Sequence, residues 1–264
     1  MRYRLLGLLM ATSFVAHAEI QTREIPYTAA DGTQMMGYYA YDDAIEGPRP
    51  GIVVVHEWWG LNDYAKQRAH NLAELGYSAL AIDMYGEGKN TDHPKDAMSF
   101  MQAALADADA AKARFNAGVD LLKQQQQTDA AKLAAVGYCF GGKVVLDMAR
   151  QGVPLDGVVS FHGALATQTR AAPGSVKARV LVEHGSADSM ISLEDVAALN
   201  AEMVAAGADY QFVSQPGAKH GFTNPGADKF QEKGVDVAYD KQADERSWAN
   251  MQRFLDETFN NPRP

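Results

Sequence analysis

The chain has 264 residues, 47% of them hydrophobic, which is enough for one large domain with a substantial core. Its formal net charge of −9 disfavours nucleic acid and anionic membrane surfaces as partners, because both carry negative charge themselves. The single cysteine excludes a disulfide within the chain.

The first 18 residues are typical of a cleaved signal peptide. Arg2 and Arg4 supply positive charge, residues 5–15 form an apolar run too short to span a bilayer, and Ala16-His17-Ala18 is a small-residue cleavage site. The alternative is an N-terminal helix that the protein retains. We therefore expect an exported protein, periplasmic or secreted, with a single domain over residues 19–264. Catalysis would explain an unpaired cysteine in such an oxidising compartment.

Strand-like and helix-like patterns alternate along the rest of the chain. Residues 24–41 read as a hairpin around the turn Asp31-Gly32. Later strand-like runs lie at residues 52–56, 78–83, 132–136, 155–161, 179–185 and 210–213. Helix-like runs lie at residues 63–75, 95–126, 143–150, 193–206 and 242–258. This alternation predicts an α/β fold with a doubly wound, mostly parallel sheet and helices on both faces.

Several local patterns add detail to the helices. Leu72 and Leu75 should lie on the buried face of the first helix. The long run at 95–126 should break near Gly118, and its polar end at 124–127 should be solvated.

The C-terminal part of the chain carries similar signals. Gly207 should end the helix at 193–206. The last helix should turn four side chains inward, namely Trp248, Met251, Phe254 and Leu255. The segment 223–240, rich in glycine, proline and charged residues, predicts a surface excursion near the functional site.

A glycine-rich segment, Gly137–Gly142, lies between the strand at 132–136 and the helix at 143–150. The pattern Gly-x-Cys-x-Gly in this context is the nucleophile elbow of α/β-hydrolases, with Cys139 as the nucleophile. Such a turn is strained and brings strand and helix too close for a Cβ atom on its flanks. The free N–H groups at the start of the helix favour a thiolate and an oxyanion. The alternative is a structural cysteine buried in a glycine-rich turn.

Two further residues follow Cys139 in the chain order typical of this fold. Asp188 comes just after the strand at 179–185, and His220 comes after the strand at 210–213. Open α/β sheets build their sites at the carboxyl ends of the strands, so both should lie near Cys139. A thiol needs a base, and the base needs a carboxylate to fix its tautomer. Asp188 could instead be a turn former, and His220 a hydrogen-bonded loop histidine.

The segment His56-Glu57-Trp58-Trp59-Gly60, after the first central strand, extends this pattern, and with it the chain resembles the dienelactone hydrolase family. The resemblance covers most of residues 20–260. The other segments that carry it are Asp83-Met84-Tyr85-Gly86, Gly137–Gly142, His184-Gly185 with Asp188, and His220-Gly221-Phe222. The His-Glu pair does not indicate a zinc helix, because Gly60 stands where a second histidine would be needed.

The resemblance implies an α/β-hydrolase fold and a role for each site residue. It implies that Cys139 is the nucleophile, His220 the base and Asp188 the residue that orients the base. It also implies that Glu57 contacts the thiol and that the backbone N–H groups of Trp58 and Phe140 form the oxyanion hole. The alternative for Glu57 is a loop carboxylate paired with a nearby base.

The chain departs from the family in its expected substrate contacts. In the family member that cleaves dienelactone, two arginines bind the substrate carboxylate. Here the corresponding segments, 86–89 and 222–225, contain no arginine, and only Lys89 could supply a single positive charge. A bidentate arginine is hard to replace, so the family name does not give the substrate. The candidate pocket residues are Trp59, Tyr85, Phe222 and Lys89, with Trp58 beside them.

Three histidines at strand ends, His56, His162 and His184, could suggest a metal site. No metal-ligand spacing supports one, so we expect hydrogen-bonded core roles for them and no metal or other cofactor.

The sequence thus predicts a hydrolase of small-molecule carboxylic esters or lactones that works through an acyl-Cys139 intermediate. A thioesterase or acyltransferase would use the same three residues on a different leaving group. A non-catalytic binding protein on a hydrolase scaffold is the alternative from another class, although a binder would not need all four of Cys139, Asp188, His220 and Glu57.

Overall fold

The computed structural model describes residues 19–260. The predicted signal peptide, residues 1–18, lies outside the described residues, so it stays a prediction. Within residues 19–260, no helix is both long enough and apolar enough to span a membrane.

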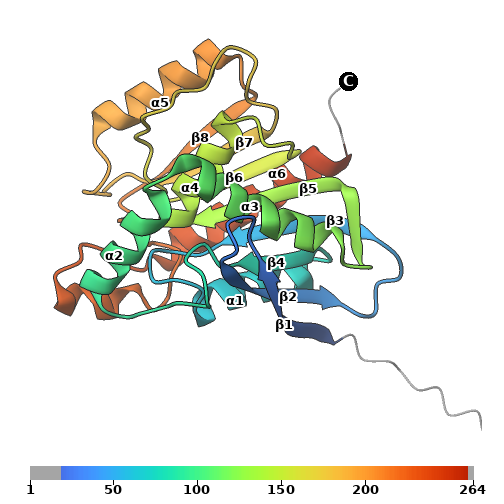
Figure 1. Ribbon diagram of the computed structural model, residues 1–264. Coiled ribbons are helices and arrows are strands. Elements are labelled where there is room, and N and C mark those ends of the chain that lie inside the picture. Colours follow the sequence, from blue (N-terminus) through green and yellow to red (C-terminus); the bar gives the residue numbers. More distant parts are fainter. Residues whose placement is uncertain (1–18, 261–264) are drawn as a thin grey trace, which may run out of the picture.

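One eight-stranded sheet organises the described chain, with strand order β1-β2-β4-β3-β5-β6-β7-β8 (Figure 1). The strands are β1 (Ile20–Thr28), β2 (Gln34–Asp42), β3 (Arg49–Val55), β4 (Ser78–Ile82), β5 (Thr128–Tyr138), β6 (Gly157–Phe161), β7 (Arg179–Gly185) and β8 (Tyr210–Gln215). β1 and β2 form the predicted antiparallel hairpin, β2 also pairs antiparallel with β4, and β3 to β8 run parallel. The predicted α/β fold with a mostly parallel sheet is confirmed.

Helices cover both faces of this sheet, as the sequence predicted. They are α1 (Asp63–Glu74), α2 (Pro94–Leu105), α3 (Ala108–Lys123), α4 (Phe140–Arg150), α5 (Leu193–Ala206), the short 3₁₀ helix η1 (Ala227–Lys233) and α6 (Lys241–Asn260). Helices α3, α4 and α5 lie on one face of the sheet, whereas α1 and α6 lie on the other (Figure 1). Side chains of each group pack against the sheet in a separate buried cluster. Alternate residues of β3 pack into the two hydrophobic cores, one on each face of the sheet. Val53 and Val55 face α3 and α4, and Ile52 and Val54 face α1 and α6. A strand buried on both faces explains the unbroken apolar run in the sequence.

The helical stretch predicted at 95–126 breaks earlier than expected. It forms two helices, α2 and α3, with the break at residues 106–107 rather than near Gly118. Asp107 starts α3, because its side chain accepts hydrogen bonds from the backbone of Asp109 and Ala110 at 2.9 and 3.0 Å. Gly118 lies inside α3, where a Cβ atom would stand 2.6 Å from a methyl group of Ile82. The glycine therefore permits close packing of α3 on β4 instead of ending the helix.

Two smaller predictions about helix ends hold only in part. Leu72 is buried as expected, but Leu75 is exposed, because α1 ends at Glu74 and Leu75 follows it as the C-cap. In the polar end at 124–127, Gln124 and Gln126 are exposed as predicted. Gln125 is buried instead: its side chain donates to the Leu121 carbonyl at 2.7 Å and accepts from Arg23 at 2.6 Å.

The C-terminal expectations hold. α5 ends at Ala206, and Gly207 adopts a left-handed conformation there, with φ of 66°. In α6, Met251, Phe254 and Leu255 are buried against the sheet, and Trp248 is partly buried beside them.

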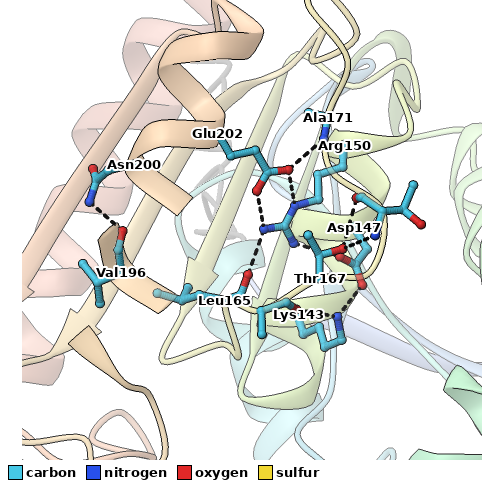
Figure 2. A network of polar contacts seen from close by, with 11 residues as sticks. Lys143, Asp147, Arg150, Leu165, Thr167, Ala171, Val196, Asn200 and Glu202 are labelled. Carbon is cyan, nitrogen blue, oxygen red and sulfur yellow. Dashed lines mark hydrogen bonds and ion pairs between the residues drawn. The ribbon is translucent and has the colours of Figure 1, made fainter. Parts of the chain in front are cut away.

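A buried ion-pair network joins α4 to α5 (Figure 2). Two guanidinium nitrogens of Arg150 donate to the two carboxylate oxygens of Glu202, both at 3.0 Å. Arg150 also donates to Asp147 at 2.8 Å and to the Leu165 carbonyl at 2.9 Å, while the Ala171 amide donates to Glu202 at 2.7 Å. The side chains of Arg150 and Glu202 are only 1% and 3% exposed. The network braces the C-terminal end of α4 and the loop that follows β6.

A second buried carboxylate, Glu183 on β7, has amide partners only. It accepts hydrogen bonds from the side chains of Gln215 on β8 at 2.7 Å and Asn250 on α6 at 2.9 Å. Burial raises the pKa of Glu183 from 4.5 to about 7, although both amide hydrogen bonds oppose the rise.

Because of this raised pKa, we expect the free energy of unfolding to depend on pH. Because the folded state binds the Glu183 proton more tightly than the unfolded state, its stabilisation is fully present below pH 4.5 and is lost as the pH rises through 7. In the Glu183→Gln variant, the side chain at position 183 cannot ionise. Relative to the wild type, its free energy of unfolding should therefore rise by about 2 kcal/mol between pH 5 and pH 8. Urea unfolding at the two pH values measures this difference, and a difference that does not change with pH would contradict the prediction.

Candidate active site

The elbow motif forms the sharp turn that its sequence predicts. Cys139 lies between β5 and α4 with φ of 54° and ψ of −113°, a left-handed conformation that is strained for a residue with a side chain. A Cβ atom on Gly137 would stand 2.0 Å from the carbonyl oxygen of Gly141, and one on Gly141 would stand 2.2 Å from that of Val55. Only glycine fits these two positions, and the turn leaves the Cys139 side chain partly exposed at the carboxyl end of the sheet.

Asp188 and His220 meet, although 32 positions separate them in the sequence. His220 Nδ1 lies 2.8 Å from Asp188 Oδ2, and the side chains are 7% and 0% exposed, respectively. The Met190 amide donates to the other Asp188 oxygen at 2.9 Å, which fixes the carboxylate. This is the pair that a hydrolase needs to orient its base.

The other ring nitrogen of His220, Nε2, is buried and makes no hydrogen bond with any described residue. His220 and Cys139 line the same cavity. Burial lowers the pKa of His220, but the interaction with Cys139 and the hydrogen bond that His220 donates to Asp188 outweigh it, so the pKa lies well above its usual value. His220 is therefore suited to take a proton from a group at the Cys139 position.

His162 supports the turn at Cys139 by accepting a hydrogen bond from the Cys139 amide. The Cys139 amide donates to the Phe161 carbonyl at 3.0 Å and to His162 Nδ1 at 3.1 Å. Burial, followed by the positive charge of His220, holds the pKa of His162 well below its usual value, so the ring is neutral. With Nδ1 accepting, Nε2 carries the hydrogen and donates to the Thr223 hydroxyl at 2.7 Å.

The other two histidines at strand ends, His56 and His184, differ from each other in their hydrogen bonds. His56 makes hydrogen bonds to the Glu57 carbonyl at 2.5 Å and from the Met84 amide at 3.2 Å, as a core histidine should. His184 is buried, but its Nδ1 makes no hydrogen bond with a described residue, so the structure shows no hydrogen-bonded role for this nitrogen. Within residues 19–260, no three histidine, cysteine or acidic side chains come together in a way that could hold a metal ion.

Glu57 lies directly after β3 and is buried beside the site. It lines a small cavity together with Cys139 and His220, and the contact with the thiol that the resemblance implies stays a prediction. Asn224 donates to its carboxylate at 2.6 Å. Burial raises the pKa of Glu57 to about 7, while the Asn224 hydrogen bond and the positive charge of His220 oppose the rise. The sequence reasoning missed Asn224, although it stands in the segment that lacks the family arginine.

The two backbone N–H groups expected to form an oxyanion hole are available. Neither the Trp58 amide nor the Phe140 amide donates a hydrogen bond to another described residue. Both residues line the main cavity beside Cys139, and Phe140 is the first residue of α4. A hydrogen bond of 3.0 Å from the Gly141 amide to the His56 carbonyl holds the two loops together.

The main cavity has a volume of about 450 Å³ and opens onto Cys139 and His220. Trp58 lines it, and so do residues 233–237, which confirms that the excursion at 223–240 lies near the site. Trp59 instead lines the small cavity beside Glu57, where its ring stacks on Phe230 with 3.7 Å between the ring centres.

The structure places the other three candidate pocket residues outside the main cavity. Phe222 is fully buried in the core beneath the sheet. Tyr85 packs against the rings of His56 and Phe140, and its hydroxyl donates to the Trp58 carbonyl at 3.1 Å. Lys89 is exposed and pairs with its neighbour Glu87 at 3.1 Å.

The methionines of the cavity were also missed by the sequence reasoning. Met98 and Met101 come from α2, and Met190 follows Asp188. No sequence pattern marks them, because the cavity gathers side chains from segments that lie far apart in the chain.

Comparisons with known proteins identify the family of the chain. The model of the dienelactone hydrolase family matches residues 35–259. A solved structure of a dienelactone hydrolase-like promiscuous phosphotriesterase from metagenomic libraries shares 37% sequence identity and a TM-score of 0.84, covering 91% of this chain and 99% of that one. Protein usf of Aquifex pyrophilus is 29% identical over 232 residues, which are 86% of this chain and 95% of that protein. A family match over most of the sequence, on a fold that agrees with it, shows that the chain belongs to the dienelactone hydrolase family.

Proposed function

We propose that the protein hydrolyses carboxylic esters or lactones through an acyl intermediate on Cys139. Family membership supports a hydrolase that acts on esters or lactones. The observation that carries the cysteine mechanism is the Asp188–His220 contact of 2.8 Å, with the free Nε2 of His220 sharing a cavity with Cys139.

In the proposed mechanism, His220 Nε2 holds the Cys139 proton while the sulfur attacks the ester carbonyl carbon. The negative charge that develops on the carbonyl oxygen is stabilised by the backbone N–H groups of Trp58 and Phe140. When the C–O bond breaks, His220 returns the proton to the leaving alcohol. A water molecule, deprotonated by His220, then attacks the thioester carbon and releases the acid, and the thiol regains its proton.

The direct test is mass spectrometry of the intact protein during turnover of an activated ester. The expected result is a burst of alcohol and a mass increase equal to one acyl group on Cys139. A matched thioester tests the alternative: faster acylation from the thioester would favour a thioesterase, and transfer of the acyl group to an added alcohol would favour an acyltransferase. A protein that binds the ester without releasing alcohol would contradict the proposed function.

Glu57 should suppress alkylation of the resting Cys139 in a pH-dependent way. A carboxylate beside the sulfur repels a thiolate, and Glu57 carries its charge mainly above its pKa of about 7. The Glu57→Gln variant should therefore react with iodoacetamide about as fast as the wild type at pH 6 but about 5-fold faster at pH 8. For an exported enzyme, slower reaction of the resting thiol would also limit its oxidation.

The control for this measurement is Glu87→Gln, which removes an exposed carboxylate outside both cavities. It should leave the alkylation rate unchanged at both pH values. If Glu57→Gln labelled no faster than the wild type at pH 8, Glu57 would have only a packing role.

A further inference from the structure

The wall of the main cavity is mostly apolar. The apolar side chains that line it include Trp58, Met98, Met101, Phe140, Met190 and Ile191. Methionine side chains are flexible and polarisable, so they adapt to apolar groups of different shape. The cavity volume of about 450 Å³ falls within the range of small-molecule sites.

The two cations that line the cavity already have partners. Lys143 binds Asp147 at 2.8 Å and the Ala166 carbonyl at 3.1 Å. Lys233 binds the backbone and side chain of Asp92 at 2.7 and 3.1 Å. No arginine lines this cavity among residues 19–260. A substrate carboxylate would therefore have to displace an existing ion pair in order to find a cation.

Negative charge also lies close to the cavity. Asp236 lines it, bound to Lys219 and to the Ser189 hydroxyl, both at 2.6 Å. Glu57 lines the small cavity together with Cys139 and His220. A buried carboxylate without a paired cation is costly, and nearby like charges add to that cost. Apolar chains, by contrast, gain from leaving water.

We propose that this cavity binds the acyl chain of a neutral ester and selects apolar chains over chains that carry a carboxylate. The acyl group stays on the sulfur after the alcohol has left, so the apolar space that opens directly onto Cys139 fits the acyl part of the substrate. This inference rests on the proposed function and names the substrate class for it.

The test compares three p-nitrophenyl esters with the same leaving group: the hexanoate, the monoadipate and the methyl adipate. The adipate replaces the terminal methyl group of the hexanoate with a carboxylate, and its methyl ester removes that charge again. We expect kcat/KM for the hexanoate and the methyl adipate to exceed that for the adipate at least 100-fold. The ratio should persist in 0.5 M salt, which screens long-range repulsion but not desolvation. Between acetate and hexanoate, kcat/KM should rise about 4-fold per buried methylene.

Two variants test whether the discrimination between the adipate and the hexanoate arises in this cavity. Met98 lines the cavity and is 41% exposed, so Met98→Arg should fold and supply the missing cation. It should raise kcat/KM for the adipate at least 10-fold relative to the hexanoate. Val204→Arg adds the same charge at a site on α5 that is 78% exposed and outside the cavity, and it should leave the ratio unchanged.

The outcomes separate the two proposals. The inference about the acyl chain is overturned if the adipate acylates Cys139 as fast as the hexanoate does. It is also overturned if Met98→Arg leaves the ratio of kcat/KM for the adipate to that for the hexanoate unchanged. In both cases Cys139 is acylated, so the proposed function stands. If no ester acylates Cys139, the proposed function fails, and this inference fails with it.

Discussion

Replacing Cys139 with alanine is expected to lower kcat for p-nitrophenyl ester hydrolysis by about 10⁴-fold or more. The sulfur is the proposed nucleophile, and no other cysteine in the sequence can take its place. His220→Ala should have nearly the same effect, because Nε2 is the group that moves the proton in both halves of the reaction. The two losses should not add in the double variant, since the residues act as a unit.

Asp188→Asn tests the orienting contact and should cost less than the loss of the nucleophile, although still orders of magnitude. His70→Ala is the matched control, because His70 lies on α1 and lines neither cavity at the site. Activity measurements accompany circular dichroism spectra of each variant, so that misfolding is recognised. Turnover by correctly folded Cys139→Ala within 10-fold of the wild type would remove the cysteine mechanism.

Breaking the Arg150–Glu202 pair is expected to produce the largest loss of stability. Arg150→Met leaves the buried Glu202 carboxylate with only the Ala171 amide as a partner, and Glu202→Leu leaves the Arg150 guanidinium without its bidentate partner (Figure 2). Arg150→Met should lower the free energy of unfolding by about 3–5 kcal/mol, because it leaves the Glu202 charge buried and unpaired. Glu202→Leu should cost less, because Arg150 keeps its ion pair with Asp147. The double variant should lose clearly less than the sum of the two, because no unpaired charge remains at either position.

Urea unfolding of the two single variants and the double variant measures this coupling. Lys123→Ala is the control, because it breaks an exposed pair with Asp120 on α3 and should cost less than about 1 kcal/mol. If the losses of the single variants added up in the double variant, the pair would contribute no specific coupling, and the stability would come from packing alone.

Much of the fold was evident in the sequence because it depends on local pattern. Residues 52–55 of β3, a strand buried on both faces, form an unbroken apolar run, and Gly207 marks the end of α5. The glycines around Cys139 were readable for the same reason: the turn brings backbone atoms so close that only one residue type fits. The order of Cys139, Asp188 and His220 then placed the site at the carboxyl ends of β5, β7 and β8.

Tertiary structure decided the features that depend on a distant partner. Gly118 looked like a helix breaker, but it permits α3 to pack on Ile82 of β4. Asn224 has meaning only because its amide reaches Glu57, which lies 167 positions earlier in the chain. The methionine-lined cavity is assembled from α2, the loop after β7 and the end of η1. Local sequence patterns record which backbone conformation a segment prefers and which of its faces is apolar, but not which side chain from another segment will lie against it.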